Sequence, residues 1–203
     1  MSKSITIEGT DLAGKTSVII PYLKTKLGTE DYLFLADMKT GKISQKVREI
    51  FMDPECITDK TDWRTIALLS STARSDMVAQ NIIPALDSGK NVVCDRYVDT
   101  AFVYNLKSDT VPVDTILNLS THLVYPNITI FAYCSYEESL IRKQARDDVA
   151  NDHWDISSAE EHQNKLDRYR EQLYKKNTRV FEIDTSGSLE NTYQLMDLII
   201  AQL

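Results

Sequence analysis

The sequence predicts an α/β fold in which a parallel sheet carries helices on both faces. Five short apolar runs alternate with longer stretches of helical character along the 203 residues. The runs are apolar at most positions, as in strands buried between two helix layers. With 42% hydrophobic residues, the chain is long enough for one well-buried core. We therefore expect a single domain over residues 1–203.

The five expected strands are residues 5–7, 32–35, 91–94, 127–132 and 180–183. The first is β-branched, the second combines leucine with two aromatic residues, and the third contains two valines. The fourth and fifth combine isoleucine or valine with phenylalanine. Strands of this kind, joined by helices, form a parallel sheet whose ligands gather at the carboxyl ends of the strands.

Helical stretches fill the intervals between these strands. They are expected at residues 15–27, 43–52, 62–86, 113–123, 136–145, 158–175 and 189–203. Pro84 is expected to kink or shorten the third stretch, because proline has no N–H group to donate. No glycine- or proline-rich linker and no internal repeat divides the chain, which supports a single domain.

Composition excludes several classes of function. The net charge of −7 argues against a large nucleic-acid interface, which would need a basic face. The three cysteines, at positions 56, 94 and 134, and the three histidines show no metal-type spacing, so we expect buried, reduced thiols and no zinc site. The sequence shows no apolar signal region and no membrane-length apolar run. We therefore expect a cytoplasmic protein with no membrane and no nucleic-acid partner.

The segment "IEGTDLAGKTS", residues 7–17, contains the pattern G-x-x-x-x-G-K-T from Gly9 to Thr16. It lies between an expected strand and an expected helix, which is the context of a phosphate-binding loop. Glycines let backbone N–H groups converge on phosphate oxygens, and the helix adds its positive N-terminus. In such loops the lysine, here Lys15, reaches the β- and γ-phosphates and the threonine, here Thr16, binds Mg²⁺. The pattern predicts binding of a nucleoside triphosphate; a glycine-rich turn with no ligand is the alternative.

Polar residues follow three of the other expected strands. Asp95 and Arg96 follow the third strand, Asp37 follows the second, and Thr185 follows the fifth. A carboxylate at such a strand end can hold magnesium through water, and an arginine can bind phosphate through two hydrogen bonds. For Asp95 and Arg96, a simple ion pair at the strand end is the alternative.

Three blocks of the chain resemble thymidylate kinases. "IEGTDLAGKTS" is similar to their phosphate loop, and "STARSDMVAQNIIPALDSGKNVVCDRYVDTAFVYN" to the stretch from their Ala-x-Arg helix to their Asp-Arg-Tyr motif. "FEIDTSGSLENTYQLM" is similar to their last strand, adenine-side loop and last helix. The resemblance covers nearly the whole chain. It implies a P-loop NTPase fold with a five-stranded parallel sheet, and a homodimer that transfers the γ-phosphoryl group of ATP, with Mg²⁺, to a deoxynucleoside monophosphate.

The resemblance also implies roles for individual residues. The implied catalytic residues are Lys15, Arg96, Arg142 and Arg146. The implied ATP-binding residues are Gly9, Thr10, Asp11, Leu12, Ala13, Gly14, Lys15, Thr16, Ser17, Thr185 and Ser186. The implied acceptor-binding residues are Asp11, Asp37, Lys39, Arg74, Arg96, Thr100 and Tyr104. The implied metal site is formed by Thr16, Asp11 and Asp95. A solvated helix arginine is the alternative for Arg74, and an ordinary core tyrosine for Tyr104.

The phosphate loop itself carries no cation between Gly9 and Gly14. The segment "LIRKQARDDVANDHWD" does, because Arg142 and Arg146 are four residues apart on one helical face. This segment resembles the lid of the bacterial-type enzymes, which we expect over residues 142–156. A charged, solvated helix is the alternative.

Two departures from the family pattern concern the acceptor. The Arg-Glu-Pro-like turn is replaced by Ala36-Asp37-Met38, and the stacking phenylalanine four residues before Arg74 is replaced by Ser70. Asp37 retains an acidic residue at the turn, and Lys39 or Lys42 is a candidate for the missing positive charge. Because an aromatic stack on the base contributes on the order of 1 kcal/mol, its loss points to relaxed or modified-pyrimidine specificity.

Two other functions remain open from the sequence. A deoxynucleoside kinase would need a glutamate near the second strand, and residues 36–42 contain none. A nucleotide-binding switch module would lack the base-facing arginine and the cationic lid. These features favour the monophosphate kinase.

Overall fold

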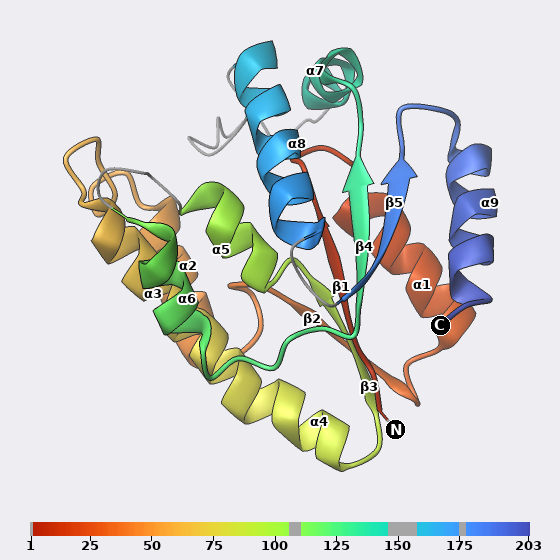
Figure 1. The fold of residues 1–203 in the computed structure, drawn as a ribbon, viewed down its shortest axis with the longest axis horizontal. Coiled ribbons are helices and arrows are strands. Elements are labelled where there is room, and N and C mark those ends of the chain that lie inside the picture. Colours follow the sequence, from red (N-terminus) through yellow and green to blue (C-terminus); the bar gives the residue numbers. More distant parts are fainter. Residues whose placement is uncertain (1, 106–110, 146–157, 175–177) are drawn as a thin grey trace.

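The protein is described here by a computed structural model that covers residues 2–105, 111–145, 158–174 and 178–203. In these residues, five strands form one parallel sheet in the order β2-β3-β1-β4-β5 (Figure 1). The strands are β1 (Ser4–Gly9), β2 (Tyr32–Ala36), β3 (Asn91–Asp95), β4 (Ile128–Tyr133) and β5 (Arg179–Asp184). The predicted α/β fold with a five-stranded parallel sheet is confirmed.

The central strand β1 is bonded to strands that lie far away in the sequence. Ile7 is in register with Asp95 on β3, and Gly9 is in register with Ala132 on β4. The carboxyl ends of these three strands therefore meet at one edge of the sheet, which is where ligands bind in folds of this class.

One face of the sheet is covered by α1 (Ile20–Leu27) and α9 (Leu189–Ile200), as Figure 1 shows. Ile5 and Ile7 of β1 pack there against Leu23 and Met196, all of them almost fully buried. Burial of this kind contributes roughly 1.5–3 kcal/mol for each large apolar side chain, so this layer fixes the position of β1.

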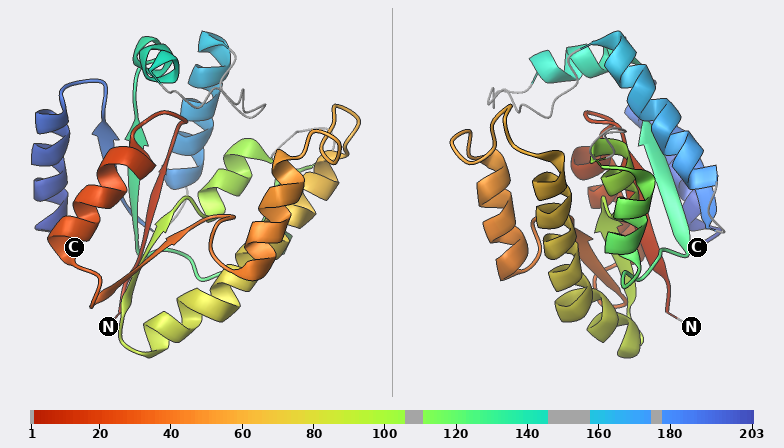
Figure 2. Two further views of the ribbon diagram at one scale, coloured as in Figure 1. Left: turned by 180° about the vertical axis from the view of Figure 1, so that it is seen from behind. Right: turned by 60° about the vertical axis from the view of Figure 1, so that its left-hand side comes forward.

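The other face is covered by several helices, visible in both views of Figure 2. They are α3 (Trp63–Met77), α4 (Ile83–Asp87), α5 (Val98–Tyr104), α6 (Val113–Ser120) and α8 (Ala159–Tyr174). α2 (Lys42–Met52) packs outside α3, and α7 (Tyr136–Gln144) follows β4. Tyr169 of α8 is fully buried against Phe131 of β4, with ring centroids 5.2 Å apart, and this contact anchors α8 to the sheet.

The third expected helix, residues 62–86, is a continuous helical segment with a change of geometry in the middle. α3 ends at Met77, a π-helical turn η2 (Val78–Ile82) follows, and α4 starts one residue before Pro84. The altered bonding just before Pro84 accommodates the missing N–H group of the proline. A second π-helical turn, η1 (Lys15–Ile19), opens the helix after the phosphate-binding loop.

The sequence did not predict α5, which begins directly after the Asp-Arg-Tyr motif.

Cys94 and Cys134 are buried free thiols, as expected. The expected burial of Cys56 is wrong: this thiol is exposed, because it lies in the turn after α2. Within the described part of the chain, no helix combines the length and apolar character needed to cross a bilayer.

Candidate active site

The segment from Gly9 to Thr16 forms a tight loop between β1 and η1. Gly9 adopts φ 143°, and a Cβ atom there would lie 1.7 Å from the Ala132 carbonyl oxygen. Gly14 adopts φ 71°, in the left-handed region that favours glycine. The backbone path therefore requires glycine at position 9 and favours it at position 14. The loop closes around the side chain of Lys15.

Lys15 lies inside this loop and is almost completely buried. Its ammonium group donates to the Gly9 carbonyl oxygen at 3.1 Å and also to the Thr10 carbonyl oxygen. Burial, aided by the nearby Arg96, lowers the pKa of Lys15 to about 7, although Asp11 and Asp95 oppose this shift. The loop thus holds a lysine whose charged form would be favoured by incoming phosphate oxygens.

Thr16 and Asp95 form a pair of hard oxygen ligands. The Thr16 hydroxyl donates to Asp95 Oδ2 at 2.5 Å, because the end of β3 lies directly beside β1. Among the described residues, no cluster of three or more acidic, histidine or cysteine side chains surrounds them. A magnesium ion that keeps several waters and binds phosphate oxygens fits such a two-ligand site. Two of the three expected metal ligands therefore lie together.

Asp11, the third expected metal ligand, has other partners. Its Oδ1 accepts from Arg96 Nη2 at 2.5 Å, and its Oδ2 accepts from the Tyr104 hydroxyl at 2.6 Å. Burial alone would raise the pKa of Asp11, but Arg96, Lys15 and Lys165 outweigh it and lower the pKa. Asp11 is thus held as a carboxylate on the side of the loop that faces α5 and α8.

Arg96 connects the turn after β3 to the phosphate-binding loop and to α8. It adopts φ 63°, which is uncommon for a residue with a side chain. Its Nη1 donates to the Gly9 carbonyl oxygen and to the Tyr169 hydroxyl, each at 2.9 Å. The sequence prediction that Arg96 lies beside the phosphate-binding loop agrees with this geometry.

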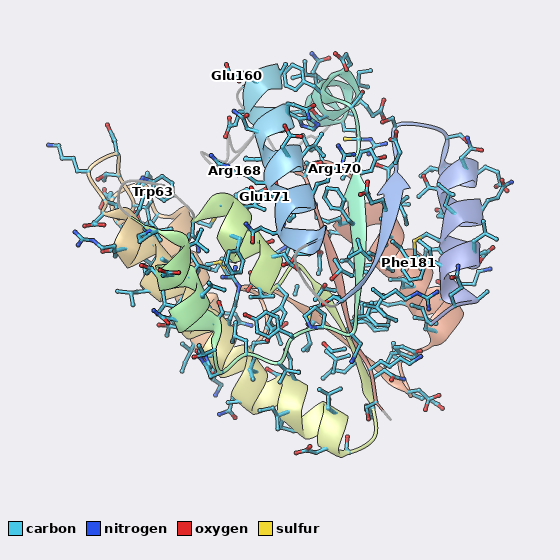
Figure 3. The ribbon with its side chains drawn as sticks, in the orientation of Figure 1. Trp63, Glu160, Arg168, Arg170, Glu171 and Phe181 are labelled. Carbon is cyan, nitrogen blue, oxygen red and sulfur yellow. The ribbon has the colours of Figure 1, made fainter. Side chains whose placement is uncertain are left out.

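Two cavities flank Asp11. The loop cavity, about 770 Å³, is lined by the phosphate-binding loop together with Lys39, Arg96, Arg142 and Thr185. The α8 cavity, about 890 Å³, is lined by Trp63, Ile66, Tyr104, Lys165 and Arg168 among others. Figure 3 shows Arg168 and Glu160 on the side of α8 that faces Trp63. Because Tyr104 and Lys165 both contact Asp11, its carboxylate lies at the boundary of the two cavities.

Arg142 lies on the loop-cavity side rather than at this boundary. Its Nη1 donates to the Leu12 carbonyl oxygen at 3.0 Å and to Thr185 Oγ1 at 3.1 Å, and its Nε donates to Glu138 at 2.8 Å. Thr185 in turn donates to the Ala13 carbonyl oxygen at 3.2 Å, so the end of β5 borders the loop, as expected. Arg146 and residues 146–156 of the expected lid lie outside the described residues.

Arg74 and Asp37 form a buried ion pair. Arg74 Nη2 lies 2.5 Å from Asp37 Oδ2, and the two side chains are 3% and 5% exposed. Asp37 Oδ1 is buried without a hydrogen-bond partner among the described residues, so this oxygen can accept one further bond. Two residues that the sequence assigned to the acceptor therefore lie together, and their expected role in binding it stays a prediction. Neither of them lines the loop cavity or the α8 cavity.

The other residues near the expected acceptor site form hydrogen bonds within the protein. The Thr100 hydroxyl donates to Glu8 Oε2 at 2.8 Å, toward the protein interior. Asn105 Nδ2 donates to Ser70 Oγ at 2.6 Å, and both residues are buried. An amide side chain therefore contacts Ser70, where the family pattern has a stacking phenylalanine. Trp63 lines the α8 cavity and is a candidate aromatic contact for the base.

Sequence reasoning missed Glu8 and Lys165. Glu8 accepts the Tyr97 N–H at 2.8 Å as well as the Thr100 hydroxyl, and it is fully buried. Burial and the nearby Asp99 raise the pKa of Glu8 to about 7. The position of Glu8 directly before Gly9 was a usable signal. Lys165 had none, because nothing in the sequence of α8 relates it to a loop more than 150 residues away.

The chain is similar to known thymidylate kinases in sequence. A family model of thymidylate kinase matches residues 7–196. A thymidylate kinase of Enterococcus faecalis is 31% identical over 191 residues, covering 92% of this chain and 89% of that protein. A thymidylate kinase of Ligilactobacillus salivarius is 30% identical over 194 residues, covering 93% of this chain and 92% of that protein.

A solved structure has the same fold. The crystal structure of thymidylate kinase from Ehrlichia chaffeensis superposes with a TM-score of 0.72 at 20% identity. The match covers 100% of this chain and 99% of that one.

Proposed function

Because this chain belongs to the thymidylate kinase family, we propose that it transfers the γ-phosphoryl group of ATP to dTMP across the boundary at Asp11. The family assignment makes the chain an ATP-dependent nucleotide kinase. It does not favour the deoxynucleoside kinase or the switch module. ATP occupies the loop cavity, and the monophosphate occupies the α8 cavity.

The observation that carries this proposal is the position of the Asp11 carboxylate. Arg96 reaches it from the loop cavity, and Tyr104 reaches it from the α8 cavity. A phosphoryl group that passes between the two cavities would pass beside these groups. Its transfer depends mainly on cations placed in advance, because charge spreads over several oxygens in the transition state.

The residues in and beside the phosphate-binding loop have separate roles in this reaction. Lys15 places a positive charge beside the phosphates. Arg96 holds the Gly9 end of the loop and also lines the loop cavity. Thr16 and Asp95 would hold Mg²⁺, which neutralises phosphate charge and orients the triphosphate. Arg142 and Thr185 hold Leu12 and Ala13 in place at the ATP side.

The acceptor specificity is proposed to extend to 5-substituted deoxyuridine monophosphates. Ser70 removes the stacking ring, and the Asn105 amide contributes a polar group beside it. A base in the α8 cavity, which Ser70 does not line, would lack this aromatic contact of about 1 kcal/mol. Trp63 at the rim of the α8 cavity would offset part of that loss.

Incubation of the protein with ATP, magnesium and a panel of nucleosides and monophosphates, with products resolved by mass, tests the proposed reaction. Formation of dTDP from dTMP is the expected result. Product formation from bare nucleosides only would contradict it. We also propose that the protein is a homodimer and acts in the cytoplasm. Measuring the mass of the protein in solution tests the dimer.

A further inference from the structure

Lys165 extends from α8 to the boundary of the two cavities. Its Nζ lies 3.4 Å from Asp11 Oδ2 and 4.6 Å from the centroid of the Tyr104 ring. The side chain is only 8% exposed and lines the α8 cavity. A lysine is rarely this buried unless it is paired, and here Asp11 and Glu161 supply negative charge.

The helix holds Lys165 in a fixed position. Lys165 and Tyr169 are four residues apart, so they lie on one face of α8. Tyr169 is fully buried against β4 and accepts a hydrogen bond from Arg96. Through Tyr169, the segment of α8 that carries Lys165 is therefore hydrogen-bonded to Arg96, in the loop after β3.

Two cations lie beside the Asp11 carboxylate at the boundary. The single carboxylate of Asp11 faces two cations, Arg96 at 2.5 Å and Lys165 at 3.4 Å. Glu161, the other partner of Lys165, is 40% exposed and lies 3.5 Å away. A phosphate dianion that enters the α8 cavity would meet the ammonium group beside Asp11, at the place where the expected lid arginine Arg142 does not reach.

We propose that Lys165 donates hydrogen bonds to the phosphate of the acceptor nucleotide and thereby selects monophosphates over nucleosides. This inference rests on the proposed function, because it assigns the acceptor to the α8 cavity. Lys165 is assigned to the acceptor and not to ATP because it lines the α8 cavity and not the loop cavity.

The test compares the dissociation constants of dTMP and thymidine in the absence of ATP. The variants are Lys165→Gln, Lys165→Arg and, as a matched control, Lys46→Gln, which removes a lysine that is 76% exposed on α2. We expect Lys165→Gln to reduce the preference for dTMP over thymidine by about tenfold or more, because a hydrogen bond to a charged group is lost. Lys165→Arg should restore most of the preference, and Lys46→Gln should leave it unchanged.

The ratio of the two constants is measured on one protein sample, so partial unfolding of a variant cancels. In steady-state kinetics, Lys165→Gln should raise KM for dTMP by a similar factor and leave KM for ATP within twofold. An unchanged preference in Lys165→Gln, in a protein whose parent phosphorylates dTMP, overturns the role of Lys165 and leaves the kinase assignment intact. A parent protein that does not phosphorylate dTMP overturns both.

Discussion

The carboxylate of Asp11 and the guanidinium group of Arg96 are 2.5 Å apart, and this ion pair joins the phosphate-binding loop to the turn after β3. Both side chains are 21% exposed, so the pair faces the cavities without being fully solvated. The pair positions two groups for which the sequence predicted separate roles, one in the loop and one at a strand end.

Lys15→Ala is expected to lower kcat/KM for dTMP phosphorylation by at least about a hundredfold, because one preorganised cation contributes several kcal/mol to transition-state stabilisation. The fold should persist, and circular dichroism together with a thermal melt checks this. Near-normal turnover in a folded Lys15→Ala protein would show that the loop is not the site of phosphoryl transfer.

Glu8→Gln is expected to change how stability depends on pH. The pKa of Glu8 is raised from 4.5 to about 7 in the folded protein, so the folded state binds more protons than the unfolded state between these values. The contribution of protonated Glu8 to the free energy of unfolding is fully present below about pH 4.5 and is lost as the pH rises through about 7. A shift of this size corresponds to about 3 kcal/mol.

Urea denaturation of the parent protein and of Glu8→Gln at pH 5 and pH 8 measures this effect. Between the two pH values, the parent should lose more free energy of unfolding than the variant does. Equal pH dependence of the two proteins would refute the raised pKa of Glu8. Asp53→Asn, at a half-buried carboxylate directly after α2, is the control.

Arg142→Ala is expected to raise KM for ATP severalfold while KM for dTMP stays within twofold. Arg142 donates to the Leu12 carbonyl oxygen and to Thr185, both on the ATP side of the loop, and it does not line the α8 cavity. Initial rates with each substrate varied in turn provide the measurement. A rise confined to KM for dTMP would place Arg142 on the acceptor side instead.

Thymidine monophosphate is expected to be phosphorylated at least about a hundredfold more efficiently than thymidine, because the phosphate gains charge-assisted hydrogen bonds of roughly 3 kcal/mol in total. Deoxyuridine monophosphate and a 5-hydroxymethyl analogue should fall within about tenfold of dTMP, since Ser70 replaces a stacking ring. Values of kcat/KM under identical ATP and magnesium decide this. A preference for deoxyguanosine monophosphate would contradict the proposed pyrimidine specificity.

The sequence was sufficient for the parts of the site that lie within one segment or at a strand end. The loop from Gly9 to Thr16 carries its own pattern, and the topology of a parallel sheet brings Thr16 and Asp95 together without further information. The ion pair between Arg74 and Asp37 was not predicted, although the sequence assigned both residues to the acceptor side.

The parts that could not be predicted depend on the packing of α8 and on charge burial. Lys165 reaches Asp11 because Tyr169 inserts its ring against β4, a contact that no local pattern encodes. The geometry of Arg142 depends on where α7 meets the end of β5. Periodicity locates both helices but does not fix which of their cations faces which cavity.

The neighbours of β1 in the sheet determine when the phosphate-binding loop can form during protein synthesis. Gly9 takes its position against Ala132, and Ile7 is in register with Asp95, so the loop has no complete framework until β4 has left the ribosome. Long-range parallel pairing is slow because chain entropy is lost before the contacts form. A nascent chain truncated before residue 128 would therefore display the whole nucleotide-binding motif and still bind no nucleotide.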